Sequence, residues 1–300
     1  MQAPHPIPYQ GSKRNIAPTI IQYFPNNIAT FIEPFTGSAA MSLATGARNR
    51  AKKFWLNDLN KPLMDLWSQI INNPEEISNQ YELLWLEQQD DPRSYYDKVR
   101  DEFNKTGRSD CFLYLLARCV KASVRYNTNG EFNQSPDNRR LGANPETMRN
   151  MILGASYLLK GKTKITSKNY RDVLEKAKPE DLVYMDPPYQ GVCRDRDNRY
   201  LTGIQLCEFI EVLRELNRKS IRYIVSYDGR TGNKVHGELL PDELDLTHIE
   251  IMAGRSTQST LLGREDITYE SLYLSPALKL QLPKESFTAS HNRNEQLALL

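Results

Sequence analysis

Short apolar runs, each bounded by polar or turn-forming residues, occur near the start of the chain and again after residue 160. Such runs are typical of buried strands. They predict strands at residues 29–33, 53–57, 164–166, 181–185, 222–226, 244–252 and 269–274. No helical pattern separates the last two runs, so we expect these two strands to pair in the antiparallel direction.

Between residues 61 and 160 the apolar positions lie three or four residues apart, a spacing that predicts helices. Leu63, Leu66 and Ile70 show this spacing. Residues 126–142 interrupt it with Asn, Gly and Pro, a composition that predicts a hairpin or a loop. Outside this block, further helices are predicted at residues 39–47 and 204–218.

Strands that alternate with helices on both sides of a helical block indicate an α/β fold with a parallel sheet and one insertion. Ser38 is a suitable N-cap for the helix predicted at residues 39–47. The expected organisation is an α/β domain at 1–60 and 161–282, a mostly helical insert at 61–160, and a flexible tail at 283–300.

Composition excludes several classes of protein. Mean hydropathy is −0.61, and no run approaches the roughly 18 apolar residues of a membrane span. The first residues lack the apolar region of a secretory signal. The 4 cysteines lie far apart without a C-x-x-C pair, which argues against a zinc site or a disulfide framework and predicts a cytoplasmic protein without a bound metal.

Charge is unevenly distributed although the net charge is only +2. Residues 72–91 hold six acidic and no basic side chains, whereas residues 118–149 hold six basic and three acidic ones. One interpretation is a face that meets a polyanion and another that avoids it. Ordinary solvated helix surface is an equally good interpretation.

The sharpest motif is Asp186-Pro187-Pro188-Tyr189, directly after an expected buried strand. The end of such a strand lies at the sheet edge where α/β proteins bind ligands. The Asp186 carboxylate and the Pro187 carbonyl offer two acceptors beside the ring of Tyr189. This combination suits the exocyclic amine of a planar heterocycle. A purely structural turn is the alternative.

A second turn, at residues 33–38, joins a strand to a helix and contains Gly37, which lets the backbone approach a ligand. Asp58 ends the next strand, where a carboxylate can accept from both hydroxyls of a ribose. An ordinary βα turn explains the first feature equally well. A helix N-cap at Asp58 or Asn60 explains the second.

The interrupted stretch interleaves polar side chains with aromatic rings, as in Arg125-Tyr126-Asn127 and Phe132-Asn133. Such a hairpin can read base edges and stack on bases. A solvated polar loop is the alternative.

Together these features resemble the Dam-like family, or D12 class, of DNA adenine-N6 methyltransferases. The resemblance covers roughly residues 8–276, with the cofactor motif, target-recognition insert and catalytic motif in the family's order. It implies a Rossmann-like S-adenosylmethionine-dependent methyltransferase sheet with an inserted, mostly helical target-recognition domain. The implied cofactor is S-adenosylmethionine, and the implied partner is double-stranded DNA.

The resemblance carries residue roles with it. The catalytic residues would be Asp186, Pro187, Pro188 and Tyr189. The cofactor would be bound by Tyr9, Lys13, Glu33, Pro34, Phe35, Gly37, Asp58, Asn169 and Asp186. DNA contacts are expected from Arg125, Asn127, Asn129, Asn133, Arg139 and Arg140 in the hairpin near 125–142.

The chain departs from the family pattern at a few positions. Ser12 stands for a second glycine between Gly11 and Lys13, and Asn169-Tyr170 stands where an Asp-Phe pair is common. The arginine-bearing residues 190–203 and the polar residues 254–260 have no assigned role.

The implied reaction is methyl transfer to N6 of an adenine that is flipped out of the duplex. Asp186 favours adenine over cytosine N4 or a protein glutamine, because enzymes for those targets tend to carry Ser or Asn at this position. An RNA adenine methyltransferase and a non-catalytic nucleic-acid-binding protein are the alternatives. A companion restriction endonuclease and a monomeric state are further expectations.

Overall fold

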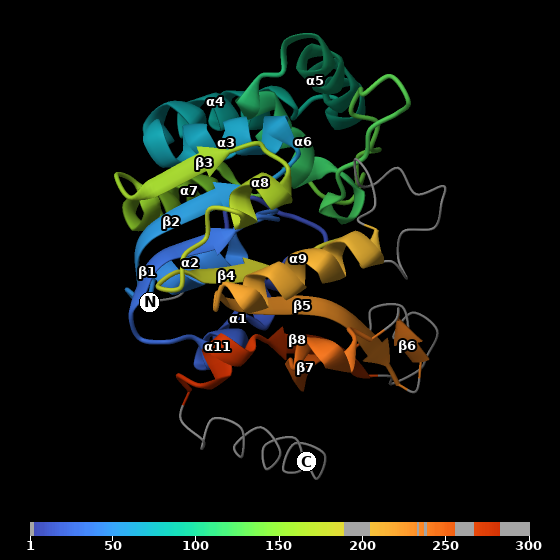
Figure 1. Ribbon diagram of the computed structural model, residues 1–300. Coiled ribbons are helices and arrows are strands. Elements are labelled where there is room, and N and C mark those ends of the chain that lie inside the picture. Colours follow the sequence, from blue (N-terminus) through green and yellow to red (C-terminus); the bar gives the residue numbers. More distant parts are fainter. Residues whose placement is uncertain (1–2, 189–204, 233, 237–238, 256–266, 283–300) are drawn as a thin grey trace, which may run out of the picture.

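The computed structural model describes residues 3–188, 205–232, 234–236, 239–255 and 267–282 (Figure 1). Tyr189, residues 190–203, most of 254–260 and the tail at 283–300 lie outside the described residues. Within the described ranges, no helix combines the length and the apolar character that crossing a membrane requires.

One mixed sheet runs through the molecule in the order β3–β2–β1–β4–β5–β8–β7, with β6 beside β5 (Figure 1). Its strands are β1 (Ile28–Glu33), β2 (Ala51–Asn57), β3 (Thr163–Thr166), β4 (Leu182–Met185), β5 (Arg222–Thr231), β6 (Lys234–His236), β7 (Thr247–Arg255) and β8 (Ile267–Leu274). Strands β3, β2, β1, β4 and β5 are parallel, and β8 lies antiparallel between β5 and β7. The expected α/β fold and the antiparallel last pair are confirmed.

Helices flank the sheet, and the central strands are buried on both faces. In β4, Leu182 and Tyr184 pack into one apolar cluster, whereas Val183 and Met185 pack into the other, as expected for a strand covered on both faces. The α-helices are α1 (Ala17–Ile20), α2 (Ala40–Gly46), α3 (Lys61–Asn72), α4 (Pro74–Glu87), α5 (Pro92–Thr106), α6 (Ser109–Arg118), α7 (Pro145–Leu159), α8 (Tyr170–Leu174), α9 (Leu206–Arg218) and α11 (Pro276–Lys279). Short 3-10 helices are η1 (Lys13–Asn15), η2 (Ile21–Tyr23), η3 (Val120–Ala122) and η4 (Asp242–Leu244).

The strand order reverses direction between β1 and β4. The chain passes from β1 outward to β2 and β3, and from β4 in the opposite direction to β5. In such sheets a crevice forms at the carboxyl ends of the two strands, and ligands bind there. Glu33 ends β1 and Asp186 follows β4, so the topology brings these two carboxyl groups to one place.

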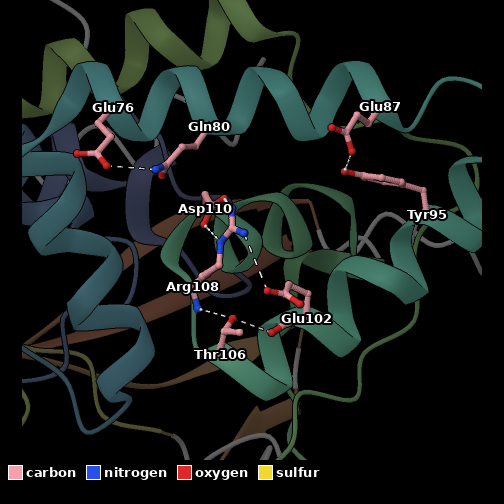
Figure 2. A network of polar contacts seen from close by, with 8 residues as sticks. All are labelled: Glu76, Gln80, Glu87, Tyr95, Glu102, Thr106, Arg108 and Asp110. Carbon is pink, nitrogen blue, oxygen red and sulfur yellow. Dashed lines mark hydrogen bonds and ion pairs between the residues drawn. The ribbon is translucent and has the colours of Figure 1, made fainter.

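Helices α3 to α7 form the block that the helical spacing predicts, near β2 and β3 (Figure 1). Polar contacts join α4, α5 and α6, as Figure 2 shows. The hydroxyl of Tyr95 donates to Glu87 at 2.8 Å, and Arg108 forms ion pairs with Asp110 and Glu102. The assignment of 61–160 as a target-recognition domain stays a prediction.

One local prediction differs from the structure. The N-cap of α2 is Ala39, at φ 49° with no side-chain cap, and not Ser38. The Ser38 hydroxyl donates instead to Oγ of Ser12, 2.7 Å away.

Residues 126–142 contain no regular strand, only isolated bridges such as Tyr126 with Phe132, so this stretch is a loop with a hairpin-like bend.

The basic stretch 118–149 does not form one face. Arg118 is buried, at 1% exposure. Arg149 forms ion pairs with Glu75 and Glu82 on the acidic helix α4. The exposed basic side chains of this stretch are those of Lys121, Arg125, Arg139 and Arg140.

Candidate active site

A cavity of about 480 Å³ lies at the carboxyl ends of β1, β2 and β4. The structure brings together on its wall every described residue that the sequence predicted for cofactor binding and catalysis. These are Tyr9, Lys13, Glu33, Pro34, Phe35, Gly37, Asp58, Asn169, Asp186, Pro187 and Pro188. Tyr189, the remaining member of the set, lies outside the described residues.

Gly37 is fixed from several sides between β1 and α2. Its φ is +47°, and a Cβ atom built on it would lie 3.2 Å from the ring of Tyr9. Its N–H donates to Asp58 at 3.0 Å, and its carbonyl accepts from the indole of Trp67 at 3.0 Å. Glycine is favoured here because a side chain would be strained at this backbone angle and would crowd the neighbouring ring.

Asp58 braces the same turn from the end of β2. Oδ2 accepts from the Gly37 N–H and Oδ1 from the Asn60 N–H, each at 3.0 Å. Burial raises the pKa of Asp58, although these backbone donors lower it. The N-cap of α3 is Asn60, which accepts from the Leu63 N–H. Asp58 is therefore not the helix cap and remains at the cavity wall.

An aromatic pair forms another part of the wall. The rings of Phe35 and Tyr170 have centroids 5.2 Å apart. Asn169, beside them, is the N-cap of α8, and its Oδ1 accepts from the Arg171 N–H at 3.0 Å. The two rings offer a flat apolar surface for a planar group.

Glu33 is a buried acid under the cavity, at 3% exposure. Its Oε2 accepts from the Ser42 N–H at 2.9 Å and from the Ser42 hydroxyl. Burial raises its pKa to about 8, against the effect of these donors, and the nearby charge of Asp186 adds to the rise. Glu33 is therefore mostly protonated at neutral pH.

Lys13 joins Asp186, which follows β4, to Glu270 of β8. Its Nζ lies 3.1 Å from Oδ1 of Asp186 and 2.8 Å from Oε1 of Glu270. Burial lowers the pKa of Lys13, but the two carboxylates outweigh it and raise the pKa well above its usual range.

Sequence reasoning missed Glu270. The available signal was the alternation along β8, where Leu272 and Leu274 are fully buried and Glu270 occupies the same row. A carboxylate in a core-facing row needs a buried partner.

The residues predicted to contact DNA do not line the cavity. The exposed ones are Arg125, Asn129, Asn133, Arg139 and Arg140. Asn127 uses its side chain inside the bend, where Oδ1 accepts from the Asn129 and Glu131 N–H groups, each at 2.9 Å. Their roles toward DNA stay predictions.

One residue of this loop reaches the cavity. Tyr126 lines it, and its hydroxyl donates to Oδ1 of Asn60 at 3.1 Å. The loop and the turn at Asp58 are thus in direct contact.

The 137–143 loop carries Arg139 and Arg140. It packs on three buried side chains of the helical block, Tyr81, Gln88 and Arg118. These anchor residues donate to backbone carbonyls of the loop, at Ala143, Leu141 and Arg140 respectively. These contacts could not be predicted from the sequence, because their acceptors are backbone atoms that every residue carries.

Among the described residues, no group of three or more His, Cys, Asp or Glu side chains is arranged to hold a metal ion. The described cysteines are free thiols, with Cys111 and Cys119 buried and Cys207 exposed. They do not line the cavity.

Comparison with known families gives a match to the D12 class N6 adenine-specific DNA methyltransferase family over residues 9–252. The chain belongs to this family. Its mixed sheet with flanking helices is the Rossmann-like fold expected of such methyltransferases. The matched range contains all of the cavity residues named above and the 137–143 loop, but ends before Glu270.

Individual relatives carry related names. The chain is 32% identical to the Type II methyltransferase M.MjaIII of Methanocaldococcus jannaschii, over 61% of this chain and 68% of that protein. It is 27% identical to M.CviBI of Paramecium bursaria Chlorella virus NC1A, over 82% and 97%. It is also 27% identical to M1.LlaDCHI of Lactococcus lactis subsp. cremoris, over 60% and 64%. The match therefore spans just under two thirds of the Lactococcus protein and nearly all of the viral one.

Proposed function

We propose that this D12-class protein transfers a methyl group from S-adenosylmethionine to N6 of an adenine flipped out of double-stranded DNA. The observation that carries the proposal is the position of Asp186. It follows β4 at the point where the strand order reverses, on the wall of a cavity that also holds Asp58 and Gly37. Ligands bind at this place in open α/β sheets.

The cavity fits the proposed cofactor. Its volume of about 480 Å³ lies within the common range for small-molecule sites. Phe35 and Tyr170 would border the adenine of the cofactor, and Asp58 would accept from its ribose hydroxyls. When bound, S-adenosylmethionine supplies an activated methyl group on a positively charged sulfur.

The chain's own residues would act on the target base. The Asp186 carboxylate and the Pro187 carbonyl would each accept one hydrogen of the N6 amine and aim its lone pair at the methyl group. The bond from N6 to the methyl group would form as the bond from that methyl group to sulfur breaks. Positive charge would pass to N6, where the carboxylate of Asp186 would stabilise it until N6 releases one proton to solvent. The ring of Tyr189 would stack on the base and offset part of the cost of unstacking it.

The exposed arginines of the 137–143 loop would contact the DNA. Arg139 and Arg140 point their charges to solvent at 86% and 74% side-chain exposure, as phosphate-binding residues do. The names of the relatives support a role beside a restriction endonuclease. We further propose a cytoplasmic monomer.

Asp186→Asn tests the proposal. Methyl transfer to a duplex is measured in a single turnover with labelled cofactor, and the modified nucleoside is identified by mass spectrometry. We expect the rate to fall by about 10²–10³-fold, because the amide lacks the charge that stabilises the transition state. Calorimetry measures cofactor binding separately, so the rate is compared at saturating cofactor.

Asp172→Asn is the matched control, because Asp172 is an exposed aspartate on α8 and should leave the rate unchanged. Wild-type transfer to cytosine, or faster transfer to RNA than to DNA, would contradict the proposal. Full activity of Asp186→Asn would contradict the mechanism.

A further inference from the structure

We propose that Glu270 is a positioning residue, which holds the Lys13 ammonium against Asp186 and so fixes the catalytic carboxylate. The proposal rests on the proposed function, because it assigns a part in that reaction to a residue of β8. Glu270 lies beyond the range of the family match, residues 9–252.

The three charged groups form a line across the sheet. Asp186 follows β4 and Glu270 lies on β8, and these strands are separated by β5. Lys13 spans this distance, with Nζ 3.1 Å from Asp186 and 2.8 Å from Glu270. The side chains are 9%, 22% and 13% exposed for Lys13, Asp186 and Glu270. Such shielding makes each ion pair stronger than one in water.

A residue of strand β5 also forms a hydrogen bond with Glu270. Ser226 of β5, which is fully buried, donates its hydroxyl to Oε1 of Glu270 at 2.6 Å. The same carboxylate oxygen therefore receives both the Ser226 hydroxyl and the Lys13 ammonium. Two charge-assisted hydrogen bonds on one atom restrict the position of the carboxylate.

A β-bulge in β5 lies opposite Glu270. Ser226 pairs with Leu272 and Gly229 with Glu270, so β5 has one more residue than β8 between the two pairs. Gly229 permits this register, because a Cβ built there would lie 2.4 Å from the Tyr269 carbonyl oxygen. Because the extra residue belongs to β5, Glu270 keeps the alternation of β8 and shares the row of Leu272 and Leu274.

The arrangement also sets the charge of the site. One ammonium between two carboxylates leaves the group of three with a net negative charge. In the proposed reaction, positive charge would move toward N6, which lies beside Asp186 in the proposed arrangement. A fixed negative group there would favour this movement of charge. Without Glu270, Lys13 would neutralise Asp186 alone and move relative to it.

The test is Glu270→Gln, compared with the wild type in single-turnover methyl transfer. We expect a loss of about 10²-fold in the rate of the chemical step, as for a small misplacement of reacting groups. The KM for the cofactor, the DNA dissociation constant and the midpoint of thermal unfolding should change little. Glu270→Asp keeps the charge and should recover part of the rate.

A double-mutant cycle with Lys13→Met separates positioning from a general structural role. Glu270→Gln should have little further effect on the rate once Lys13 is replaced. The matched control is Glu250→Gln, because Glu250 of β7 also forms an ion pair at 2.8 Å, but with Arg230 and not with Lys13. This control should retain the wild-type rate.

Acetylation of Lys13 by acetic anhydride, mapped by mass spectrometry, reports on the contact without any catalysis. Glu270→Gln removes a carboxylate that favours the charged ammonium, so acetylation of Lys13 should become faster. Glu250→Gln should not change it. Unchanged acetylation, or equal effects of Glu270→Gln with and without Lys13, would overturn the proposal.

The two proposals fail in different ways. If the wild-type protein transfers no methyl group to adenine, the proposed function fails, and the acetylation experiment still decides whether Glu270 holds Lys13. If the wild type is active and Glu270→Gln matches it, only the role of Glu270 fails.

Discussion

The cavity and the 137–143 loop both present charged side chains, but the structure holds them in opposite ways. In the cavity the side chains bind one another: Lys13 is 9% exposed and lies between two carboxylates. In the loop the anchor residues bind the backbone, and the side chain of Arg139 is 86% exposed. Chemistry requires fixed side chains, whereas contact with a polyanion requires a fixed backbone that carries exposed charges.

The difference also concerns electrostatics. Interactions between exposed charges are screened within about 10 Å at 0.1 M salt, whereas buried pairs are screened much less. We therefore expect pH to act mainly on the cavity, through its buried acids, and salt to act mainly on the loop. The following substitutions test this division.

The largest effect is expected from Glu33→Gln, and it concerns how the free energy of unfolding changes with pH. The pKa of Glu33 is raised from 4.5 to about 8 in the folded protein. Between these values the folded form keeps a proton that the unfolded chain releases, so the free energy of unfolding falls as pH rises through this window. Over this pH window, the free energy of unfolding should fall by roughly 4 kcal/mol because of Glu33. Glu33→Gln should abolish this part of the pH dependence.

Urea denaturation at pH 5 and pH 8 measures the effect. The wild type should lose more stability between the two values than Glu33→Gln does. Glu175→Gln is the control, because Glu175 is exposed at the end of α8, and it should behave like the wild type. An equal loss in Glu33→Gln and the wild type would show that Glu33 is not a buried, proton-holding group.

A smaller effect is expected from Arg118→Met, which removes an anchor of the loop. Arg118 donates to the carbonyls of Arg140 and, at 3.1 Å, of Pro92. Leaving these acceptors without a donor should cost about 2 kcal/mol in the free energy of unfolding. Because the loop carries the exposed arginines, DNA affinity should fall while cofactor affinity stays the same.

Denaturation and fluorescence anisotropy with a labelled duplex measure the two quantities. Arg149→Met is the matched control, because its guanidinium pairs with Glu75 near the surface. A surface ion pair contributes at most about 1 kcal/mol. If Arg118→Met lowers stability without weakening DNA binding, the anchor does not serve recognition.

Whether a residue of the cavity or of the 137–143 loop could be predicted from the sequence depends on how far apart its partners lie along the chain. Gly37, Asp58 and Asp186 were identified because each ends or follows a strand, and the topology brings strand ends together. Glu270 was not identified, because its contact with Lys13 depends on the order of the strands in the sheet.

Local rules also failed where a distant partner intervened. Ser38 fits the pattern of an N-cap, yet its hydroxyl binds Ser12, and Ala39 takes the left-handed conformation instead. Arg118 belongs to the basic stretch that suggested a DNA-binding face, yet it is buried under the loop. Counting charges along the sequence cannot separate a buried anchor from an exposed contact.

The smallest effect per side chain is expected for DNA affinity in a double variant, in which Arg139 and Arg140 are both replaced by Gln. Each exposed arginine that meets a phosphate should contribute about one unit to the slope of log affinity against log salt. The double variant should therefore bind DNA more weakly and lose roughly two units of slope. Both arginines lie near Asp137 in the free protein, at 3.1 and 3.7 Å, so binding must exchange these ion pairs for phosphate contacts.

Anisotropy titrations at several salt concentrations give the slope, and calorimetry gives the cofactor affinity, which should not change. Arg218→Gln is the matched control, because Arg218 is 77% exposed and pairs with Glu215 on α9. The control removes one positive charge and the double variant two. If the control lowers the slope by half as much as the double variant, the effect comes from net charge alone. If neither changes it, DNA meets another surface, and an exposed arginine on a rigid loop is then no sufficient sign of a phosphate contact.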